Sequence, residues 1–328
     1  MKYHAAPSAL TFALLITVLT ACGKKEQQSS SEPQKHVGLM LLASHPVIND
    51  LRDGFKERLN ETASTHSVSI VYDEKNAEGN AATLNQLAAY FASGKHDLVY
   101  AIGSDSALKL KSKDSKIPVL FAGTPDPVRN GFVDSLEEPG SNLTGARFLP
   151  PASIILELIT KAMPGTRKLA ILRNPSELNS QSVAEPFIAT ASKDGFQVGD
   201  FGITETSQLP AVLSKIRSES WPVVFIPTDN LVYQNLKQVA ASLSEAGIPF
   251  VSVTDSAVKA GAMFSIGVSY RDVGRYTADV ASTILFDGKH PEDTPVLDIR
   301  QGYLFVTSKN AEKFRPLAPK NFPILVVD

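Results

Sequence analysis

The segment "IPVLFAG" (Ile117–Gly123) has a counterpart later in the chain, "IPFVSVT" (Ile248–Thr254). Each is a short, mainly apolar run that follows a helical pattern. Such runs are typical of parallel strands that are covered by helices on both faces. Strands of this kind that alternate with amphipathic helices predict βαβ units. Because the same pattern occurs in both parts of the chain, the sequence predicts two similar α/β halves.

Further strands and helices are predicted outward from these two runs. The remaining strand candidates are Val37–Ala43, Ser67–Tyr72, Asp97–Ile102, Lys168–Leu172, Phe196–Phe201, Val223–Ile226, Leu304–Thr307 and Ile324–Val327. The main helical patterns are Asn80–Ser93, Ala152–Met163, Glu177–Ala191, Gln208–Ser218, Leu231–Ala246 and Arg271–Phe286. In the first of these, Leu84, Leu87, Ala88 and Phe91 recur at helical spacing and place one apolar stripe on one face.

A polar stretch separates the two series. Residues Asp134–Pro151 are rich in Gly, Pro and charged residues and show little periodicity, so we predict a crossover between two lobes there. The length of 328 residues also favours two domains over one. The fold class predicted is α/β, with two Rossmann-like lobes built on parallel sheets.

Composition excludes several classes of function. A net charge of −2 gives no reason to expect nucleic-acid binding, which usually requires a basic surface. The single cysteine, Cys22, excludes an intrachain disulfide and a cysteine-cluster metal site. No two of the six histidines have the close spacing of zinc ligands. We therefore expect neither a metal nor a cofactor.

The N-terminal segment predicts an exported protein. The apolar run from Ala9 to Leu19 is too short for a membrane span and fits the core of a signal peptide. It ends in Leu19-Thr20-Ala21-Cys22, which resembles a bacterial lipobox. That resemblance implies cleavage before Cys22 and a lipid on its thiol. The polar residues from Gly23 to Lys35 then predict a flexible tether.

This segment predicts a location in the cell envelope, on a membrane and facing the periplasm or the cell exterior. The alternatives are an ordinary secretory signal with a chance cysteine, or a buried Cys22 in an N-terminal helix.

Motifs of common enzymes are absent from the sequence. It contains no Gly-x-x-x-x-Gly-Lys, His-Glu-x-x-His or Gly-x-Ser-x-Gly motif, and no glycine fingerprint follows the first strand. Ser-x-x-Lys occurs at Ser106–Lys109 and again at Ser256–Lys259, without the motifs that accompany it in serine enzymes. We interpret both serines as helix caps and expect a protein that is not an enzyme.

Polar residues gather directly after the predicted strands, where open α/β sheets bind their ligands. The candidate ligand-binding residues are Ser44, Ser104, Asp105, Thr124, Asp126, Asn174, Glu177, Asp229, Asn230 and Asp255. Hydroxyl groups and helix-starting amides suit a carboxylate, whereas acidic side chains suit an ammonium group. A cleft with both would bind a zwitterion such as an amino acid. The same residue types also cap helices, and that alternative stays open.

Several segments together resemble a known family. They are "SHPVINDLRDGFKERL" (Ser44–Leu59), "DPVRNGFVDSLEEPGSNLTG" (Asp126–Gly145), "NPSELNSQS" (Asn174–Ser182), Asp229-Asn230 and "GVSYRDVGRYTADVASTILFDGKHP" (Gly267–Pro291). They resemble the ABC transporter solute-binding family that includes tryptophan/tyrosine-binding lipoproteins. The resemblance implies a type I periplasmic-binding fold with a multi-strand hinge. Lobe 1 would comprise residues 36–146 and about 268–294, and lobe 2 residues 147–267 and about 295–328.

The resemblance also implies roles for single residues. Asp126, Asn174, Glu177 and Asp229 would be polar ligand contacts, and Ser44 and Ser104 would hold a carboxylate. The sequence departs from the family at Ser104-Asp105, where members often have Thr-Pro, and at Ser269, where many have Asp. Asp105 adds a charge near the cleft. Phe121, Phe148 and Tyr233 are the candidates for an aromatic wall against the ligand.

We therefore expect a lipid-anchored, monomeric substrate-binding protein of an ABC importer. It would bind a small polar or zwitterionic solute, with an aromatic amino acid favoured, by hinge closure between the lobes. Its partners would be the solute, a membrane permease and the lipid anchor on Cys22. The alternative is a ligand sensor that signals to a membrane histidine kinase or cyclase.

Overall fold

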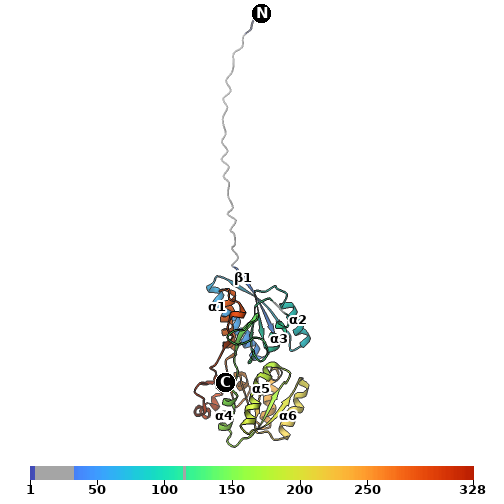
Figure 1. Ribbon diagram of the computed structural model, residues 1–328, viewed down its shortest axis with the longest axis vertical. Helices are drawn as coiled ribbons and strands as arrows, with labels where there is room; N and C mark the ends of the chain where they lie inside the picture. The colour runs from blue at the N-terminus through green and yellow to red at the C-terminus, as the bar shows by residue number, and fades with distance from the viewer. Residues whose placement is uncertain (4–32, 114–115) are drawn as a thin grey trace. The chain divides into compact units, whose positions relative to one another are not determined.

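The computed structural model describes residues 1–3, 33–113 and 116–328, which include two β-sheets with helices packed on them (Figure 1). The predicted signal segment and Cys22 lie outside the described residues. Among the residues that are described, no helix has the length and apolar character needed to cross a membrane.

The first lobe is built on a parallel sheet with the strand order β11-β5-β4-β3-β1-β2. The strands are β1 (Gln34–Leu41), β2 (Ser69–Asn76), β3 (Leu98–Ile102), β4 (Val119–Ala122), β5 (Leu143–Arg147) and β11 (Leu297–Asp298). The helices are α1 (Pro46–Thr65), α2 (Ala81–Phe91), α3 (Ser104–Lys111) and α10 (Tyr270–Leu285). β3 and β4 are buried along their whole length, as the continuous apolar runs predicted.

The second lobe is built on a sheet with the order β13-β12-β10-β9-β8-β6-β7, in which only the β10–β12 pair is antiparallel among the described strands. The strands are β6 (Lys168–Arg173), β7 (Gln197–Gly202), β8 (Val224–Phe225), β9 (Phe250–Ser252), β10 (Phe264–Gly267), β12 (Tyr303–Val306) and β13 (Ile324–Val326). The helices are α4 (Ala152–Ala162), α5 (Leu178–Lys193), α6 (Leu209–Ser218), α7 (Asn230–Gln234), α8 (Leu236–Glu245), α9 (Asp255–Lys259) and α11 (Ser308–Phe314).

Residues 148–151, 268–269 and 299–302 connect the two lobes. After the second of these connections α10 returns to the first lobe and packs along α1, with which it lies side by side in Figure 1. β11 still belongs to the first sheet, so the chain re-enters the second lobe a few residues after the boundary predicted at about residue 295. Three segments of the described chain therefore cross between the lobes.

The polar stretch Asp134–Pro151, predicted as a crossover alone, contains the strand β5. Its sequence "LTGAR" lacks an apolar run because one position must be glycine. A Cβ atom on Gly145 would lie 2.1 Å from the carbonyl oxygen of Phe121 on β4. The neighbouring strand therefore leaves no room for a side chain there, and the strand signal in the sequence is weak.

The helix predicted over Leu231–Ala246 is divided at Asn235 into α7 and α8. The side chain of Asn235 donates a hydrogen bond to the carbonyl oxygen of Leu231 at 2.8 Å. Side chains of this type compete with the backbone for hydrogen bonds and interrupt a helix. The short α7 consequently places its own N-terminus between the two lobes.

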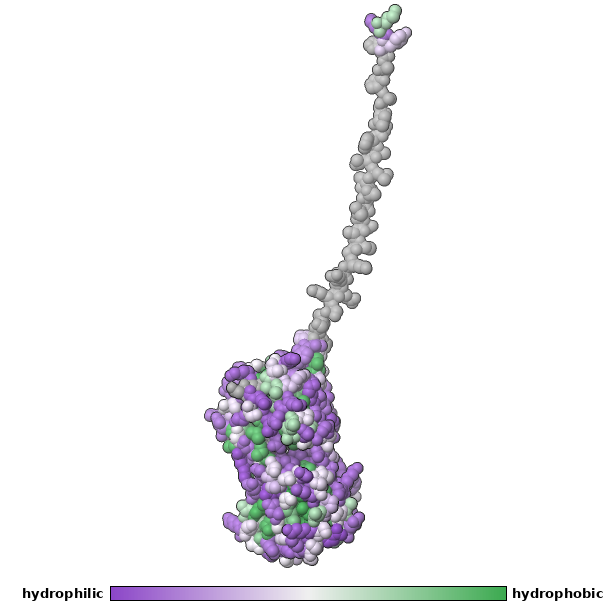
Figure 2. Space-filling model, turned by 90° about the vertical axis from the view of Figure 1, so that its right-hand side faces the viewer, coloured by the Kyte–Doolittle hydropathy of each residue, from purple (hydrophilic) through white to green (hydrophobic). Residues whose placement is uncertain are grey.

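Hydrophilic residues predominate on the face of the molecule that Figure 2 shows, and apolar residues lie there in small groups. Exposed large apolar side chains such as Val71, Tyr90 and Val128 are far apart in the sequence. Scattered apolar residues are ordinary for a protein surface. The apolar side chains are otherwise collected in the cores around both sheets, where for example Phe55 stacks on Tyr100 and Phe187 on Phe225.

Candidate functional site

The ends of the strands of both lobes meet at a small cavity of about 20 Å³. The first lobe contributes His45, Ile48 and Leu51, which lie at the start of α1. The second lobe contributes Asn179, Asp229 and Tyr233. A cavity of this size holds about one water molecule. An amino acid could bind only after the lobes move apart or the lining side chains shift, so the structure represents a closed arrangement of the lobes.

Glu177 is the centre of a buried hydrogen-bond network beside this cavity. Its Oε2 atom accepts from the backbone N–H of Asn230 and from the Asn230 side-chain amide, both at 2.7 Å. Its Oε1 atom accepts from the backbone N–H of Leu231 at 3.1 Å and from the Asn174 amide at 3.2 Å. Two of the N–H groups at the start of α7 are therefore bonded to Glu177.

Asp229 is also buried, and it caps α7 by accepting from the backbone N–H of Val232 at 2.9 Å. Its second oxygen accepts from the backbone N–H of Asn174. Burial raises the pKa of Asp229, and the charge of the neighbouring Glu177 raises it further. Asp229 is thus both a helix cap and part of the cavity wall.

Asp105 adds a carboxylate from the first lobe. It lies in the first turn of α3, and burial together with the charge of Glu177 raises its pKa to about 6, although Lys109 lowers it. The charges of Asp105 on one lobe and Glu177 on the other repel each other. An ammonium group placed between them would relieve this repulsion and form charge-assisted hydrogen bonds.

The other predicted residues of the first lobe are placed differently. Ser104 and Thr124 are buried and hydrogen-bonded to each other at 3.3 Å. Ser44 is exposed and accepts a hydrogen bond from the Asn76 amide at 2.7 Å. Asp126 accepts from the backbone N–H of Arg129 at 3.1 Å, which is a local turn contact. Neither Ser44 nor Asp126 lines the 20 Å³ cavity.

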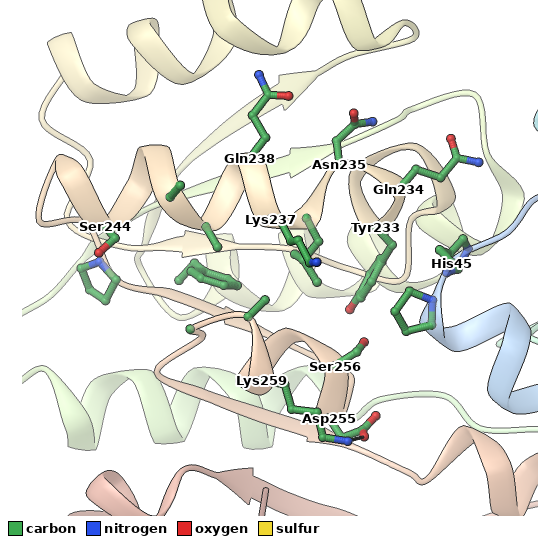
Figure 3. A pocket seen from close by; sticks show the side chains of 18 of the residues that line it. His45, Tyr233, Gln234, Asn235, Lys237, Gln238, Ser244, Asp255, Ser256 and Lys259 are labelled. Atoms are coloured by element: carbon green, nitrogen blue, oxygen red, sulfur yellow. Dashed lines mark hydrogen bonds and ion pairs between the residues drawn. The ribbon is translucent and has the colours of Figure 1, made fainter. Parts of the chain in front are cut away.

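A wider groove of about 1350 Å³ lies outside the cavity, between α8, α9 and the start of α1 (Figure 3). Ser44 and Asp255 line this groove, and Asp255 forms an ion pair with Lys259 at 2.8 Å. His45 and Tyr233 line both the groove and the cavity, and Figure 3 shows them next to each other. These two rings therefore separate the cavity from the groove.

Of the three aromatic candidates, Tyr233 lines the cavity, whereas Phe121 packs against Phe132 in the core of the first lobe. Phe148 is buried in the core where the chain leaves the first lobe. Tyr270, the first residue of α10, also lines the cavity and was not among the candidates. The sequence signal for Tyr270 was its place in the family segment Gly267–Pro291, directly before the helix predicted from Arg271.

His45 is the other lining residue that was not among the site candidates. It is 6% exposed, it is the N-cap residue of α1, and its Nε2 atom lies 3.0 Å from Oδ1 of Asn230 on the other lobe. Its ring stacks on that of Tyr233, with 6.0 Å between the ring centres. Burial lowers the pKa of His45 to about 4. Its position two residues after the predicted strand Val37–Ala43 was the available signal.

The two Ser-x-x-Lys serines are not the helix caps that we predicted. Ser106 is buried within the first turn of α3, whose cap residue is Gly103. Ser256 lies in α9, whose cap is the hydroxyl of Thr254. The helices begin before these serines, α3 at Ser104 and α9 at Asp255. No group of three or more potential metal ligands is found within the described parts of the chain.

The raised pKa of Asp105 makes one prediction for stability. Its carboxyl binds its proton more tightly in the folded protein than its ordinary pKa of 3.8 allows. The folded state is therefore favoured most below about pH 4, and this contribution is lost as the pH rises through about 6. We expect Asp105→Asn, which cannot ionise, to raise the free energy of unfolding by about 1–2 kcal/mol near neutral pH.

Urea unfolding of both proteins between about pH 4 and pH 7.5 measures this effect. The difference between the variant and the wild type should shrink towards the acidic end. Asp194→Asn, at an exposed position after α5, is the control and should change the free energy of unfolding by less than about 0.5 kcal/mol. A constant difference for Asp105→Asn would contradict the assignment.

Comparison with known proteins gives consistent matches over almost the whole described chain. A family model described as ABC transporter substrate binding protein matches residues 36–322. The tyrosine-binding protein of Clostridioides difficile (strain R20291) is 28% identical over 299 residues, which cover 89% of this chain and 86% of that protein.

Two solved structures are similar throughout. One is an ABC domain from Streptococcus pneumonia in complex with L-Trp, with a TM-score of 0.80 and 25% identity over 88% of this chain and 100% of that one. The other is a conserved domain protein from Vibrio cholerae, with a TM-score of 0.79 and 26% identity over 89% of this chain and 99% of that one. These matches confirm the predicted two-lobed α/β architecture of type I periplasmic-binding proteins.

Proposed function

We propose, because the chain belongs to the ABC transporter substrate binding protein family, that it captures a free aromatic amino acid between its two lobes for an ABC importer. The observation that carries this proposal is the joint presence of carboxylates and aromatic rings between the lobes. Asp105 and Glu177 repel each other across the cleft, and Tyr233 and Tyr270 line the cavity beside them. The relatives named for tyrosine and bound to L-Trp support an aromatic ligand.

The two ends of an amino acid would contact different parts of the cleft. The ammonium group suits the region between Asp105 and the buried carboxylates Glu177 and Asp229. The carboxylate suits the first turn of α3, where no side chain caps the helix and its cap residue, Gly103, lines the cavity. This excludes the exposed Ser44 as the carboxylate contact, whereas Ser104 would contribute its backbone N–H, because it is the first residue of α3.

Binding would then favour the closed state. Without a ligand, closure brings the negative charges of Asp105 and Glu177 together, which costs free energy. A ligand ammonium between them offsets this cost and so shifts the population towards the closed form. A permease that recognises the closed form would receive loaded protein. We propose in addition that Cys22 carries the lipid that keeps the protein at the membrane.

Thermal unfolding of the purified chain with each of the common amino acids tests the proposal. A ligand at a hundredfold excess over its Kd adds about 2.7 kcal/mol, which should raise the midpoint by about 5–10 °C for a chain of this size. We expect this shift for tryptophan or tyrosine and a smaller one for alanine. A well-folded sample whose midpoint no amino acid changes would contradict an amino-acid ligand.

A further inference from the structure

The hydrogen bonds around Asn230 fix the orientation of the groups that connect the two lobes. Glu177 accepts from the backbone N–H groups of Asn230 and Leu231, so its carboxylate is an acceptor. The Asn230 amide nitrogen, 2.7 Å from the same carboxylate, must therefore face Glu177. The Asn230 oxygen then faces His45, and the His45 ring must carry its proton on Nε2 to donate across the 3.0 Å contact.

The opposite nitrogen of the His45 ring is consequently an acceptor. Burial keeps the imidazole neutral, because its pKa is lowered to about 4. With the proton on Nε2, Nδ1 carries only a lone pair. Nδ1 is buried, and among the described residues it has no hydrogen-bond partner. Buried acceptors of this kind are rare in proteins and require a partner, because an unpaired one costs free energy.

The surroundings of His45 indicate which kind of donor would bind there. Its ring stacks on Tyr233, and Ile48, Leu51 and Tyr270 line the same cavity, so the neighbourhood is largely aromatic and apolar. A ligand ammonium is better placed at the carboxylates, where its hydrogen bonds are charge-assisted. The donor that remains for a neutral imidazole is an uncharged N–H or O–H group on an aromatic ring.

We infer that Nδ1 of His45 accepts a hydrogen bond from the ring of the bound ligand and so selects an indole or a phenol over an unsubstituted phenyl ring. This inference rests on the proposed function, since it presumes an aromatic amino acid in the cleft. Tryptophan and tyrosine, the two ligands named for the similar proteins, both carry such a ring donor. Phenylalanine lacks it and would leave Nδ1 buried and unpaired.

Two substitutions separate the two nitrogens of the ring. His45→Gln can still donate from its amide nitrogen to Asn230 but has no acceptor at the position of Nδ1. His45→Asn offers an acceptor near the position of Nδ1 but is too short to reach Asn230. The first variant thus removes the proposed selectivity, and the second removes the contact between the lobes.

Calorimetric titration of the wild type and both variants with tryptophan, tyrosine and phenylalanine is the test. We expect the wild type to bind tryptophan or tyrosine about 10- to 100-fold more tightly than phenylalanine. In His45→Gln the difference should fall below about threefold, because the ring donor then lacks its acceptor. In His45→Asn all three ligands should weaken while the preference persists.

The outcomes that contradict the inference differ from those that contradict the proposed function. A preference that is unchanged in His45→Gln would overturn the inference alone. An equal loss for all three ligands in His45→Gln would also overturn it, since it would place Nδ1 at the ammonium group that they share. Equal affinity of the wild type for tryptophan, tyrosine and phenylalanine would overturn the inference as well. A wild type that binds no aromatic amino acid would overturn the proposed function, and the inference with it.

Discussion

Glu177→Ala is expected to lower the free energy of unfolding by about 3 kcal/mol and to weaken amino-acid binding at least about tenfold. The carboxylate accepts from two backbone N–H groups at the start of α7 and from the side-chain amides of Asn174 and Asn230. Removing it leaves these buried donors without their partner. The position of Asn230, which connects the second lobe to His45, depends on the same network.

Part of this loss will be offset by the removal of a repulsive charge. Glu177 contributes to the raised pKa of both Asp105 and Asp229, so its removal should lower the pKa of each. Burial is the largest cause that raises the pKa of each group, and it remains in the variant. The pKa of Asp105, followed by NMR titration, therefore reports whether Glu177 faces the first lobe in solution as it does in the structure.

Glu157→Ala is the matched control because Glu157 lies on α4 of the same lobe. Its side chain is 56% exposed and pairs with Lys161 of the same helix. Exposed ion pairs contribute about 0–1 kcal/mol, so stability and affinity should change little. Glu177→Gln keeps the volume but directs an NH₂ group at a backbone donor, and it should fall between the wild type and Glu177→Ala. A Glu177→Ala protein that is as stable as the wild type would show that charge repulsion outweighs the hydrogen bonds.

Gly274→Ala is expected to lower the free energy of unfolding by about 2–3 kcal/mol. Gly274 lies on α10 where this helix crosses α1. A Cβ atom there would be 2.3 Å from the carbonyl oxygen of Leu51 and 2.9 Å from the backbone nitrogen of Phe55. Because both neighbours are backbone atoms, the helices would have to separate. Helix propensity alone predicts the opposite, a gain of about 1 kcal/mol for alanine.

Urea unfolding shows directly whether Gly274→Ala lowers or raises the free energy of unfolding. Ser64→Ala, at an exposed position on α1, is the control and should change the free energy of unfolding by less than about 0.5 kcal/mol. A stabilised Gly274→Ala protein would mean that α1 and α10 are not in backbone contact in solution. Since α10 is the segment that returns to the first lobe between two hinge connections, its loosening should also weaken ligand binding.

Much of the fold was predictable because its signals are local. Buried parallel strands require continuous apolar runs, and the helices between them require an apolar stripe, so both can be read without knowledge of their neighbours. β5 was not predicted because its sequence lacks a continuous apolar run. The neighbouring strand β4 excludes a side chain at Gly145, and this contact cannot be recognised from the sequence of β5 alone. The helix expected over Leu231–Ala246 was divided by the hydrogen bonds of Asn235, which the apolar pattern does not report.

The candidate site was predictable only in outline. The rule that ligands bind after the strands of an α/β sheet located Asn174, Glu177, Asp229 and Asn230, which the structure brings together. It could not separate these residues from Asp126, which has the same local sequence features but bonds its own turn. It also selected Ser44 for a ligand carboxylate, although this residue is exposed and bonds the Asn76 amide.

By itself the sequence determined the order of strands and helices, the division into two lobes and the edge of each sheet where polar residues collect. These features follow from the pattern of apolar and polar residues, which can be recognised within each segment separately. Only the tertiary structure decided which polar groups meet. The hydrogen bond between His45 and Asn230 joins residues 185 positions apart, and the one between Glu177 and the Asn230 amide joins residues 53 apart. Such pairs depend on how distant segments of the chain pack together, and the local sequence pattern does not contain this information.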